Sequence, residues 1–408
     1  MAGSLFKLLQ IEILAAHCPW PFTRRQRIAP RYNPRPWLRR AGGMKTDEIQ
    51  ALEKRLGEFE IPHATARLGT AGGRFSVEEG AEAYRVSVTL GFPVERSRAE
   101  LIEALREHVA GLHLGRTIAF EVDWAVESHS VQHGLKPLGG VSNLIAVASG
   151  KGGVGKSTVT VNLSLAFAQE GARVGVLDAD IYGPSQPRML GLMGQRPVSR
   201  DGKSLEPLEA HGIKAMSIGF LVDERQPMAW RGPMVTSALN QLLNDTNWGQ
   251  LDYLLVDMPP GTGDIQLTLS QRVPVSGAII VTTPQAISLA DARKGLEMFQ
   301  KVNVPILGIV ENMSRHICTS CGHEEPIFGH GGAERLAVEY DLPMLGGLPL
   351  DGRIRETTDR GEPTVVADPD GSLARYYRQI ARAAGAHLAA QGKDYSQLFP
   401  TITVEEDT

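Results

Sequence analysis

A nine-residue segment rich in glycine and lysine has the residue types that bind phosphate. It follows the apolar stretch Leu144–Ala148 and consists of Gly150, Lys151, Gly152, Gly153, Val154, Gly155, Lys156, Ser157 and Thr158. Glycines let the backbone turn its N–H groups onto phosphate oxygens, and a helix that starts at the end of the loop adds positive potential. Strand, loop and helix in this order are the context of a Walker A loop. We therefore expect Lys156 to bridge the β- and γ-phosphates of a nucleotide and Ser157 to offer its hydroxyl to Mg²⁺.

Aspartates follow two further apolar stretches. Asp178 and Asp180 come at the end of Val174–Leu177, and Asp257 comes at the end of Leu254–Val256. We expect Asp257 to face magnesium as a Walker B residue does, Asp180 to orient the attacking water, and Asp178 to lie nearer the loop and the metal. The alternative for Asp178 and Asp180 is that they cap the next turn. The segment after Asp257 is Met-Pro-Pro-Gly-Thr-Gly-Asp, whose glycines favour a switch that senses the γ-phosphate.

A pair of cysteines forms a C-x-x-C motif. Cys318 and Cys321 are flanked by His316 and His323. Thiolates favour zinc or iron–sulfur clusters, and both usually require four ligands, so one C-x-x-C is half a site. The residues leave three interpretations open: a [4Fe–4S] cluster completed by a second copy of the chain, a zinc site, or a redox dithiol.

Short apolar strands alternate with helical stretches through the larger part of the chain. The expected strands are Leu144–Ala148, Val174–Leu177, Leu254–Val256, Ala278–Val281, Ile306–Val310 and Met344–Leu348. Their apolar character is continuous, as in strands that are buried on both faces. This predicts an α/β fold: a doubly wound, mostly parallel sheet in a P-loop NTPase domain over residues 144–390. In such sheets ligands bind at the carboxyl ends of the strands, which is where the aspartates fall.

A smaller unit precedes this domain. Apolar residues have helical spacing from Asp47 and over Ala99–Val109, and alternate over Tyr84–Leu90, with a further strand at Thr117–Val122. We expect a small α+β domain over residues 44–131 and a linker over residues 132–143, where glycine and proline interrupt the pattern.

Composition limits the function classes. The 408 residues are 42% hydrophobic and 22% charged, with a net charge of −4. Residues 1–43 hold eight basic residues and one acidic residue, so 34 basic and 45 acidic residues remain in the rest. An acidic body argues against a broad nucleic-acid surface. We expect residues 1–43 to be a disordered basic leader or a mis-assigned start upstream of Met44, and residues 391–408 to be an acidic tail.

Cellular location and membrane association can also be predicted. No apolar run approaches the length of a membrane span. The chain has three cysteines, of which Cys18 has no expected partner, so a disulfide framework is not predicted. We therefore expect a reducing compartment, and the cytoplasm is the simplest one.

The second lysine of the loop narrows the class of nucleotide-binding protein. Lys151 follows the first loop glycine, an arrangement that resembles the deviant Walker A ATPases. That resemblance implies a homodimer in which Lys151 reaches the partner's nucleotide. It also implies that Asn312, after the stretch Ile306–Val310, recognises adenine, so ATP is expected rather than GTP.

Several motifs together resemble the Mrp-type (ApbC-like) iron–sulfur cluster carrier ATPases. They are Ser149–Thr158, Asp178–Ser185, Trp230–Pro233, Asp257–Asp264, Glu311–Ser314, the C-x-x-C and Ile327–Gly329. The resemblance covers nearly all of residues 44–390. It implies a homodimer that holds a [4Fe–4S] cluster on paired C-x-x-C motifs and transfers it to apoproteins, with a slow, magnesium-dependent ATPase as the switch.

The same resemblance bears on the small domain and the partners. Residues 44–131 resemble the MIP18-like domain that precedes the ATPase in many members. They lack the cysteine that relatives of that domain often carry near a proline-containing turn, since the turn here is Gly-Phe-Pro-Val-Glu at residues 91–95. A docking role is therefore expected. The implied cofactors are ATP, Mg²⁺ and the cluster, and the implied partners are recipient apoproteins and scaffold proteins, with no nucleic acid and no membrane.

Two other classes compete with this interpretation. A nitrogenase-reductase-like electron donor does not arrange its cluster cysteines as C-x-x-C. A partition or septum-positioning ATPase of the ParA/MinD type shares the loop, but typically needs a DNA-binding surface or a basic amphipathic C-terminal helix. The chain ends in Val-Glu-Glu-Asp-Thr, which does not suit an anionic membrane.

Overall fold

The computed structural model describes most of the chain. It covers residues 47–64, 66–70, 72–132, 134–222, 232–318 and 320–393. Expectations for the leader, Met44, Cys18, Trp230, Arg231 and residues 394–408 of the tail lie outside the described residues. No helix in the described ranges is long and apolar enough to cross a membrane.

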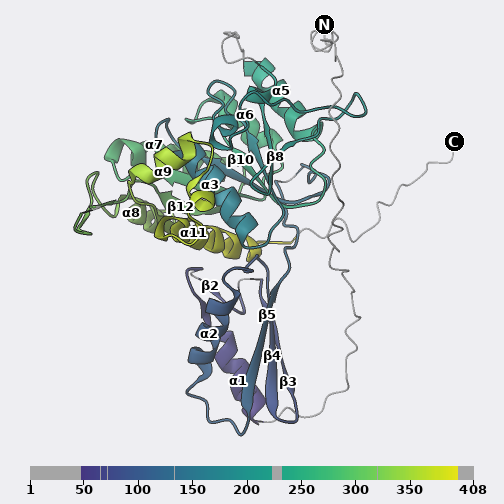
Figure 1. The fold of residues 1–408 in the computed structure, drawn as a ribbon, viewed down its shortest axis with the longest axis vertical. Helices are drawn as coiled ribbons and strands as arrows, with labels where there is room; N and C mark the ends of the chain where they lie inside the picture. The colour runs from purple at the N-terminus through teal and green to yellow at the C-terminus, as the bar shows by residue number, and fades with distance from the viewer. Residues whose placement is uncertain are drawn as a thin grey trace, which may run out of the picture. The chain divides into compact units, whose positions relative to one another are not determined.

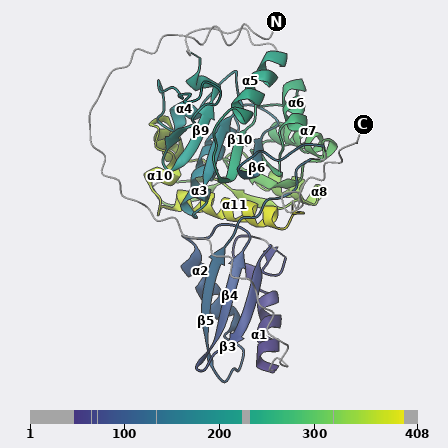
Figure 2. The same cartoon turned by 90° about the vertical axis from the view of Figure 1, so that its right-hand side faces the viewer.

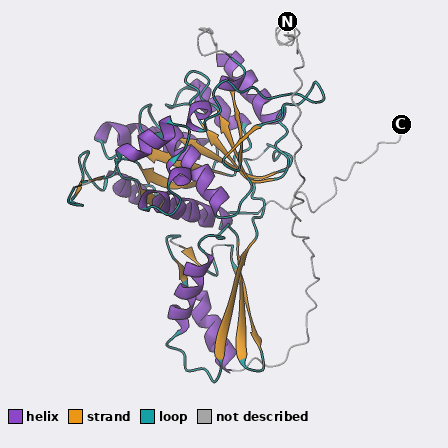
Figure 3. Ribbon diagram, viewed as in Figure 1, coloured by secondary structure: helices purple, strands orange, loops and turns teal. Residues whose placement is uncertain are grey.

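The small N-terminal domain is a three-stranded sheet with two helices. The chain runs through α1 (Asp47–Gly57), β1 (Glu60–Ile61), β2 (Ala66–Arg67), β3 (Arg74–Glu79), β4 (Ala83–Leu90), α2 (Arg98–Val109) and β5 (Thr117–Trp124). The sheet order is β3-β4-β5, with β3 antiparallel and β5 parallel to β4. The alternating burial of β4 matches its sequence pattern, because one face packs on the helices and the other meets solvent. Figure 3 shows these strands and helices by class.

The larger domain is built on one eight-stranded sheet. Its strands are β6 (Val141–Ala148), β7 (Val174–Asp178), β8 (Leu208–Ala210), β9 (Ile213–Ser217), β10 (Leu251–Asp257), β11 (Gly277–Thr282), β12 (Ile306–Glu311) and β15 (Met344–Gly347). The order is β15-β12-β11-β6-β10-β7-β9-β8, and every neighbouring pair is parallel except β9 and the edge strand β8, which are antiparallel. All six expected strands are present, and the fold class is confirmed. Strand β6 begins at Val141, inside the segment expected to be linker.

Helices cover both faces of this sheet (Figures 1 and 2). Helix α3 (Lys156–Gln169) and α11 (Ser372–Ala389) pack on each other, and between them they contact β6, β7, β10, β11, β12 and β15. Helix α7 (Ala286–Lys301) packs on β11 and β12, and α8 (Gly332–Glu339) packs on α7, β12 and β15. The remaining helices are α4 (Gln186–Met189), η1 (Ile218–Phe220), α5 (Gly232–Asn244), α6 (Asp264–Arg272), α9 (Gly352–Asp359) and α10 (Thr364–Ala367).

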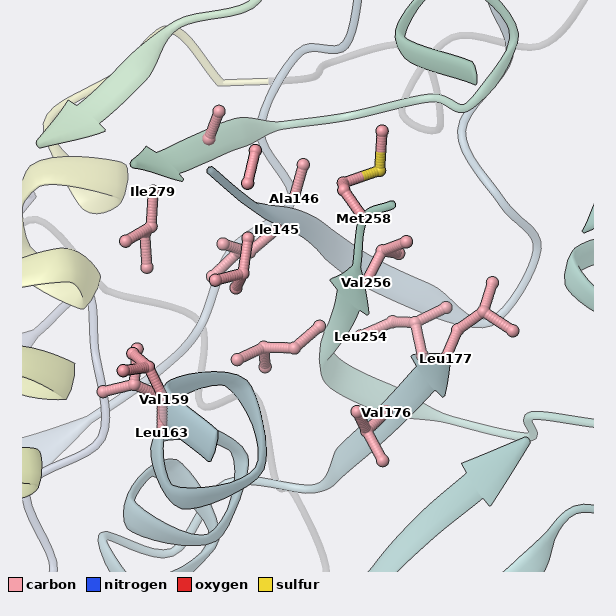
Figure 4. Packing of buried hydrophobic residues seen from close by; sticks show 14 of the residues in the cluster. Ile145, Ala146, Val159, Leu163, Val176, Leu177, Leu254, Val256, Met258 and Ile279 are labelled. Carbon is pink, nitrogen blue, oxygen red and sulfur yellow. The ribbon is translucent and has the colours of Figure 1, made fainter. Parts of the chain in front are cut away.

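The core of the larger domain lies where α3 crosses the central strands. Figure 4 shows Val159 and Leu163 of α3 facing Ile145 of β6, with Leu254 and Val256 of β10 beside them. All five side chains are at most 1% exposed. Their burial contributes roughly 1.5–3 kcal/mol for each large aliphatic side chain. The first turn of α3, and with it the glycine-rich loop, is thus held on the two central strands.

Candidate functional site

The glycine-rich loop connects the central strand β6 to α3, as expected. Ser149 Oγ donates to the Lys151 carbonyl at 2.9 Å, and Gly155 is the N-cap residue of α3. Gly155 has φ 81°, in the left-handed region that favours glycine, and a Cβ there would lie 2.2 Å from Asn312 Nδ2. The sequence therefore forms the loop at the carboxyl edge of the sheet, where parallel α/β folds bind ligands.

A buried ion pair joins the loop to the end of β10. Lys156 Nζ donates to Asp257 Oδ1, and the two side chains are 6% and 0% exposed. Thr160 Oγ1, one helical turn further along α3, lies 3.3 Å from the same oxygen. Lys156 Nζ also lies 3.3 Å from Ser157 Oγ. The loop lysine, the loop serine and the expected Walker B aspartate are therefore one cluster.

Asp178 is a capping residue. It is 0% exposed. Its Oδ2 accepts from the backbone N–H groups of Ser185 and Gln186, at 3.0 and 3.1 Å, and from Ser217 Oγ at 3.1 Å, while Oδ1 accepts from Asp180 N. This is the capping alternative that the sequence left open. Burial, with the nearby charge of Asp257, raises the pKa of Asp178 to about 7.

Asp180 has a different environment from Asp178. It is half-buried, its Oδ1 accepts a hydrogen bond at 3.3 Å from Gly183 N, and the backbone N–H of Tyr182 also donates to this carboxylate. Burial raises its pKa, and the Lys156 ammonium offsets part of that rise. Asp180 therefore also makes the contacts of the capping alternative that the sequence left open, and its expected role with water stays a prediction.

The segment after Asp257 is tied to the strand that precedes the glycine-rich loop. Met258 N donates to the Val147 carbonyl at 3.0 Å, and Gly261 N donates to the Ser149 carbonyl at 3.1 Å. Gly261 has φ 97°, which a residue with a side chain rarely adopts. The expected switch segment therefore contacts the root of the loop directly.

Lys151 and Asn312 border the loop in different ways. The Lys151 ammonium has no hydrogen bond or ion pair with any residue that the structure describes, and the side chain is half-exposed. Asn312 is 8% exposed and donates from Nδ2 to the Val154 carbonyl at 2.9 Å. Asn312 is thus a contact of the loop itself, and its expected role with adenine stays a prediction.

The C-x-x-C motif lies on a hairpin that follows β12. Strands β13 (His316–Ile317) and β14 (Glu324–Glu325) pair antiparallel, and Cys318 N donates to the His323 carbonyl at 2.9 Å. Both cysteines are free thiols; Cys318 is partly exposed and Cys321 is exposed. N–H groups of Cys321 and Ser320 lower the pKa of the Cys318 thiol. The turn therefore favours a thiolate, the form that binds metals.

The two histidines near the motif do not complete a metal site. His316 Nδ1 lies 3.2 Å from the Leu350 carbonyl, and His323 is exposed. Among the described residues, no group of three or more His, Cys, Asp or Glu side chains could hold a metal ion. The intrachain zinc interpretation therefore has no support from the described geometry.

Three residues of the site were not expected from the sequence. Gln186 Nε2 donates to Asp257 Oδ2 at 3.0 Å, Thr160 contacts Asp257 Oδ1, and Ser217 contacts Asp178. Thr160 had a signal, since it lies one turn after Lys156 on the same helix face. Ser217 ends β9, a strand that the sequence pattern did not reveal. Gln186 directly follows the Asp178–Ser185 motif, and nothing in the sequence around it indicates a contact with Asp257.

The fold and the loop together define a P-loop NTPase, and comparison with known proteins specifies which kind. Residues 140–384 match the family described as "ParA: NUBPL iron-transfer P-loop NTPase". The iron–sulfur cluster carrier protein of Haemophilus influenzae is 48% identical over 349 residues, which is 86% of this chain and 94% of that protein. The chain therefore belongs to the Mrp/ApbC/NUBPL family of P-loop NTPases, whose bacterial members are called iron–sulfur cluster carrier proteins.

Further relatives agree with this assignment. The Escherichia coli K12 iron–sulfur cluster carrier protein is 54% identical over 299 residues, covering 71% of this chain and 80% of that protein. Mouse iron–sulfur cluster transfer protein NUBPL is 54% identical over 248 residues, covering 60% of this chain and 77% of that protein. Among solved structures, a nucleotide-binding protein from Archaeoglobus fulgidus in complex with ADP is 39% identical, with a TM-score of 0.51, covering 57% of this chain and 90% of that chain.

Proposed function

We propose that this protein carries a [4Fe–4S] cluster between two copies of the chain and transfers it to recipient apoproteins, with ATP binding and hydrolysis as the switch. Cys318 and Cys321 of each copy supply the four thiolates. The names of the bacterial relatives and of mouse NUBPL support cluster carriage. The ADP in the Archaeoglobus fulgidus structure supports nucleotide binding.

The observation that carries this proposal is the half-complete ligand set. Two thiols project on an exposed hairpin turn, and no third ligand accompanies them in the described part of the chain. A cubane cluster needs four ligands, so a single chain leaves two positions open. A second copy with the same hairpin completes the set symmetrically, as a twofold interface requires. The cluster is then bound at an exposed face from which a recipient can take it.

The site beside the glycine-rich loop fits magnesium and a nucleoside triphosphate. A hydroxyl from Ser157 and the Asp257 carboxylate are the hard oxygen donors that Mg²⁺ prefers, and a lysine ammonium lies between them. When bound, Mg²⁺ neutralises charge on the phosphate oxygens. Lys156 then exchanges the Asp257 carboxylate for phosphate, and Asp180 orients water. Asn312 contacts adenine, and Lys151, which has no partner among the described residues, reaches the nucleotide of the second copy.

A short, well-anchored segment links the two sites. Asn312 bonds the loop at Val154, and only five residues separate it from Cys318. Ser314 N and Oγ both donate to the Leu348 carbonyl, at 2.8 and 3.0 Å. Arg315 Nη2 donates to Tyr376 Oη at 3.0 Å, and its Nε lies 3.1 Å from Glu324 Oε2 on the far strand of the hairpin. A movement of the loop on nucleotide binding would therefore be transmitted to the thiols through the backbone from Asn312 to Cys318 and through these hydrogen bonds.

Anaerobic reconstitution with iron and sulfide tests the proposal. The wild-type protein is expected to take up iron with the visible absorption of an iron–sulfur cluster, and Cys318→Ala and Cys321→Ala to lose both. Ser320→Ala, in the same turn, is the matched control and is expected to load like the wild type. Transfer to an apoprotein is then followed by the recipient's own activity. Equal iron loading of wild type and Cys318→Ala would contradict the proposal.

A further inference from the structure

The strongest unassigned feature of the molecule is a buried amide inside the nucleotide site. Gln186 is the first residue of α4 and is 0% exposed. Burial of a polar amide is costly unless its hydrogen bonds are made, so a fully buried glutamine requires specific partners. Its partners are residues of the glycine-rich loop and of β10. The inference below rests on the nucleotide binding proposed above.

The contacts of Gln186 fix the orientation of its amide group. Nε2 donates to Asp257 Oδ2 at 3.0 Å and to the Ser157 carbonyl at 3.2 Å. Both partners are oxygens that can only accept, because Asp257 is ion-paired with Lys156 and is therefore a carboxylate. A flipped amide would place Oε1 against two oxygens. Both amide protons are thus committed, and Oε1 is buried without a hydrogen-bond partner among the described residues.

The two oxygens of the Asp257 carboxylate accept hydrogen bonds from different parts of the chain. Oδ1 accepts hydrogen bonds from Lys156 Nζ and Thr160 Oγ1 of α3, while Oδ2 accepts a hydrogen bond from Gln186 Nε2. Lys156 is the donor that must turn towards phosphate when a nucleotide binds. Gln186 is neutral and held by its backbone N–H on Asp178 at 3.1 Å, so it stays in place when Lys156 moves.

We propose that Gln186 is a positioning residue for magnesium. It joins the carboxylate of Asp257 to the backbone carbonyl of Ser157, so that this carboxylate and the Ser157 hydroxyl, the two groups expected to face the metal, keep a fixed spacing. Residues that hydrogen-bond metal ligands from outside tune metal affinity, and their loss typically costs about 10–100-fold. The amide acts through Asp257 and does not touch the reacting atoms.

The test separates magnesium binding from nucleotide binding. The affinity of a fluorescent ADP analogue is measured in excess EDTA and in excess Mg²⁺, for the wild type and for Gln186→Met, which keeps the side-chain volume and removes both N–H donors. The variant is expected to match the wild type in EDTA. The gain in affinity that Mg²⁺ brings to the wild type is expected to fall about tenfold or more. An unchanged gain overturns the proposal.

Two further variants control for a merely structural role. Ser185→Ala removes the neighbouring hydroxyl, which is buried and has no described partner, and leaves Asp257 untouched, so its magnesium gain is expected to equal that of the wild type. In an Asp257→Asn background Gln186→Met is expected to add no further loss, because the amide acts through that carboxylate. Additive losses would show a separate effect and overturn the proposal.

The remaining outcomes are also decisive. If Gln186→Met does not fold, Gln186→Asn carries the same comparison, since it keeps a buried amide but withdraws it from Asp257 by one methylene. Its magnesium gain is expected to fall in the same direction, and an unchanged gain again overturns the proposal. A wild-type protein that binds no nucleotide in either buffer would contradict the proposed function instead, so the two failures are distinguishable.

Discussion

Lys156 Nζ of the first turn of α3 and the Asp257 carboxylate at the end of β10 form an ion pair that is almost entirely shielded from solvent. Among the hydrogen-bond partners that the structure describes for these two side chains, each is the only opposite charge that the other meets. A charged side chain in the protein interior is stable only when an opposite charge pairs with it, because its hydration is lost. The pair therefore keeps the loop lysine at the position where phosphate is expected to bind. It also neutralises the Asp257 charge until the lysine turns towards a bound phosphate.

Removing one member of this pair is expected to destabilise the nucleotide-free protein strongly. Lys156→Met leaves the Asp257 charge buried and unpaired, which costs about 3–5 kcal/mol in comparable pairs. The double variant Lys156→Met with Asp257→Asn removes both charges and is expected to recover much of that loss. Urea unfolding of the wild type, both single variants and the double variant measures the coupling. Additive single losses would contradict the pairing.

The phosphate and thiol sites are separate, so one can be disabled alone. Under conditions in which the variant stays folded, Lys156→Ala is expected to load iron like the wild type while losing ATP hydrolysis and every ATP-dependent effect on cluster transfer. Iron content after reconstitution and phosphate release are the two measurements. ATPase rates equal to the wild-type rate would contradict the role of Lys156 as the phosphate lysine.

Close packing of the glycine-rich loop on α7 gives a prediction with a matched control. A Cβ at Gly150 would lie 2.1 Å from the carbonyl carbon of Asp291 and 2.2 Å from its oxygen, so Gly150→Ala must displace the loop or the helix. The expected loss is roughly 1–3 kcal/mol of folding stability, as in overpacked sites. At Gly152 the nearest atom to an added Cβ is Pro260 Cβ at 3.9 Å, so Gly152→Ala is expected to unfold at nearly the wild-type denaturant concentration. Equal losses in both variants would contradict this packing.

The buried carboxyl of Asp178 makes stability depend on pH. Burial and the charge of Asp257 raise its pKa to about 7, so between its ordinary value and about 7 the folded protein binds more protons than the unfolded chain. The free energy of unfolding of the nucleotide-free protein is therefore expected to fall as pH rises through this window, and to level off above it. Asp178→Asn cannot titrate and is expected to lose this slope. Denaturant unfolding from pH 5 to pH 8 measures this pH dependence in the wild type and in Asp178→Asn. Identical slopes of unfolding free energy against pH in the two proteins would contradict the assignment to Asp178.

The parallel sheet and the phosphate loop could be predicted because their signals are local. Each of the six expected strands is a continuous apolar run, and the loop lies between β6 and α3 where its glycines indicate. Strands β8 and β9 were not predicted. They are short, and β9 includes Lys214 and Ser217, which break the apolar run. Strand β9 joins the sheet by pairing with β7, a long-range contact without a local signature, and β8 then pairs with β9 at the edge.

The other features that the sequence did not predict depend on contacts between residues far apart in the chain. The sequence could not decide whether Asp178 faces the metal or caps a turn, because the answer depends on how residues 179–186 fold back onto β7. Gln186 meets Asp257 across 71 residues of chain. The C-x-x-C motif could be recognised from the spacing of its cysteines, whereas coordinates were needed to show that no group of three or more His, Cys, Asp or Glu side chains among the described residues could hold a metal ion. The roles of Lys151 and Asn312, the docking role of residues 44–131 and the cytoplasmic location stay predictions.

Native mass spectrometry of anaerobically reconstituted protein tests the central claim most directly. If two chains share one cluster, the loaded species has the mass of two chains with four irons and four sulfides, and Cys318→Ala, mixed with wild type, gives pairs that fail to retain it. A single chain that carries one zinc ion and never iron, or one complete cluster on its own, would contradict the account.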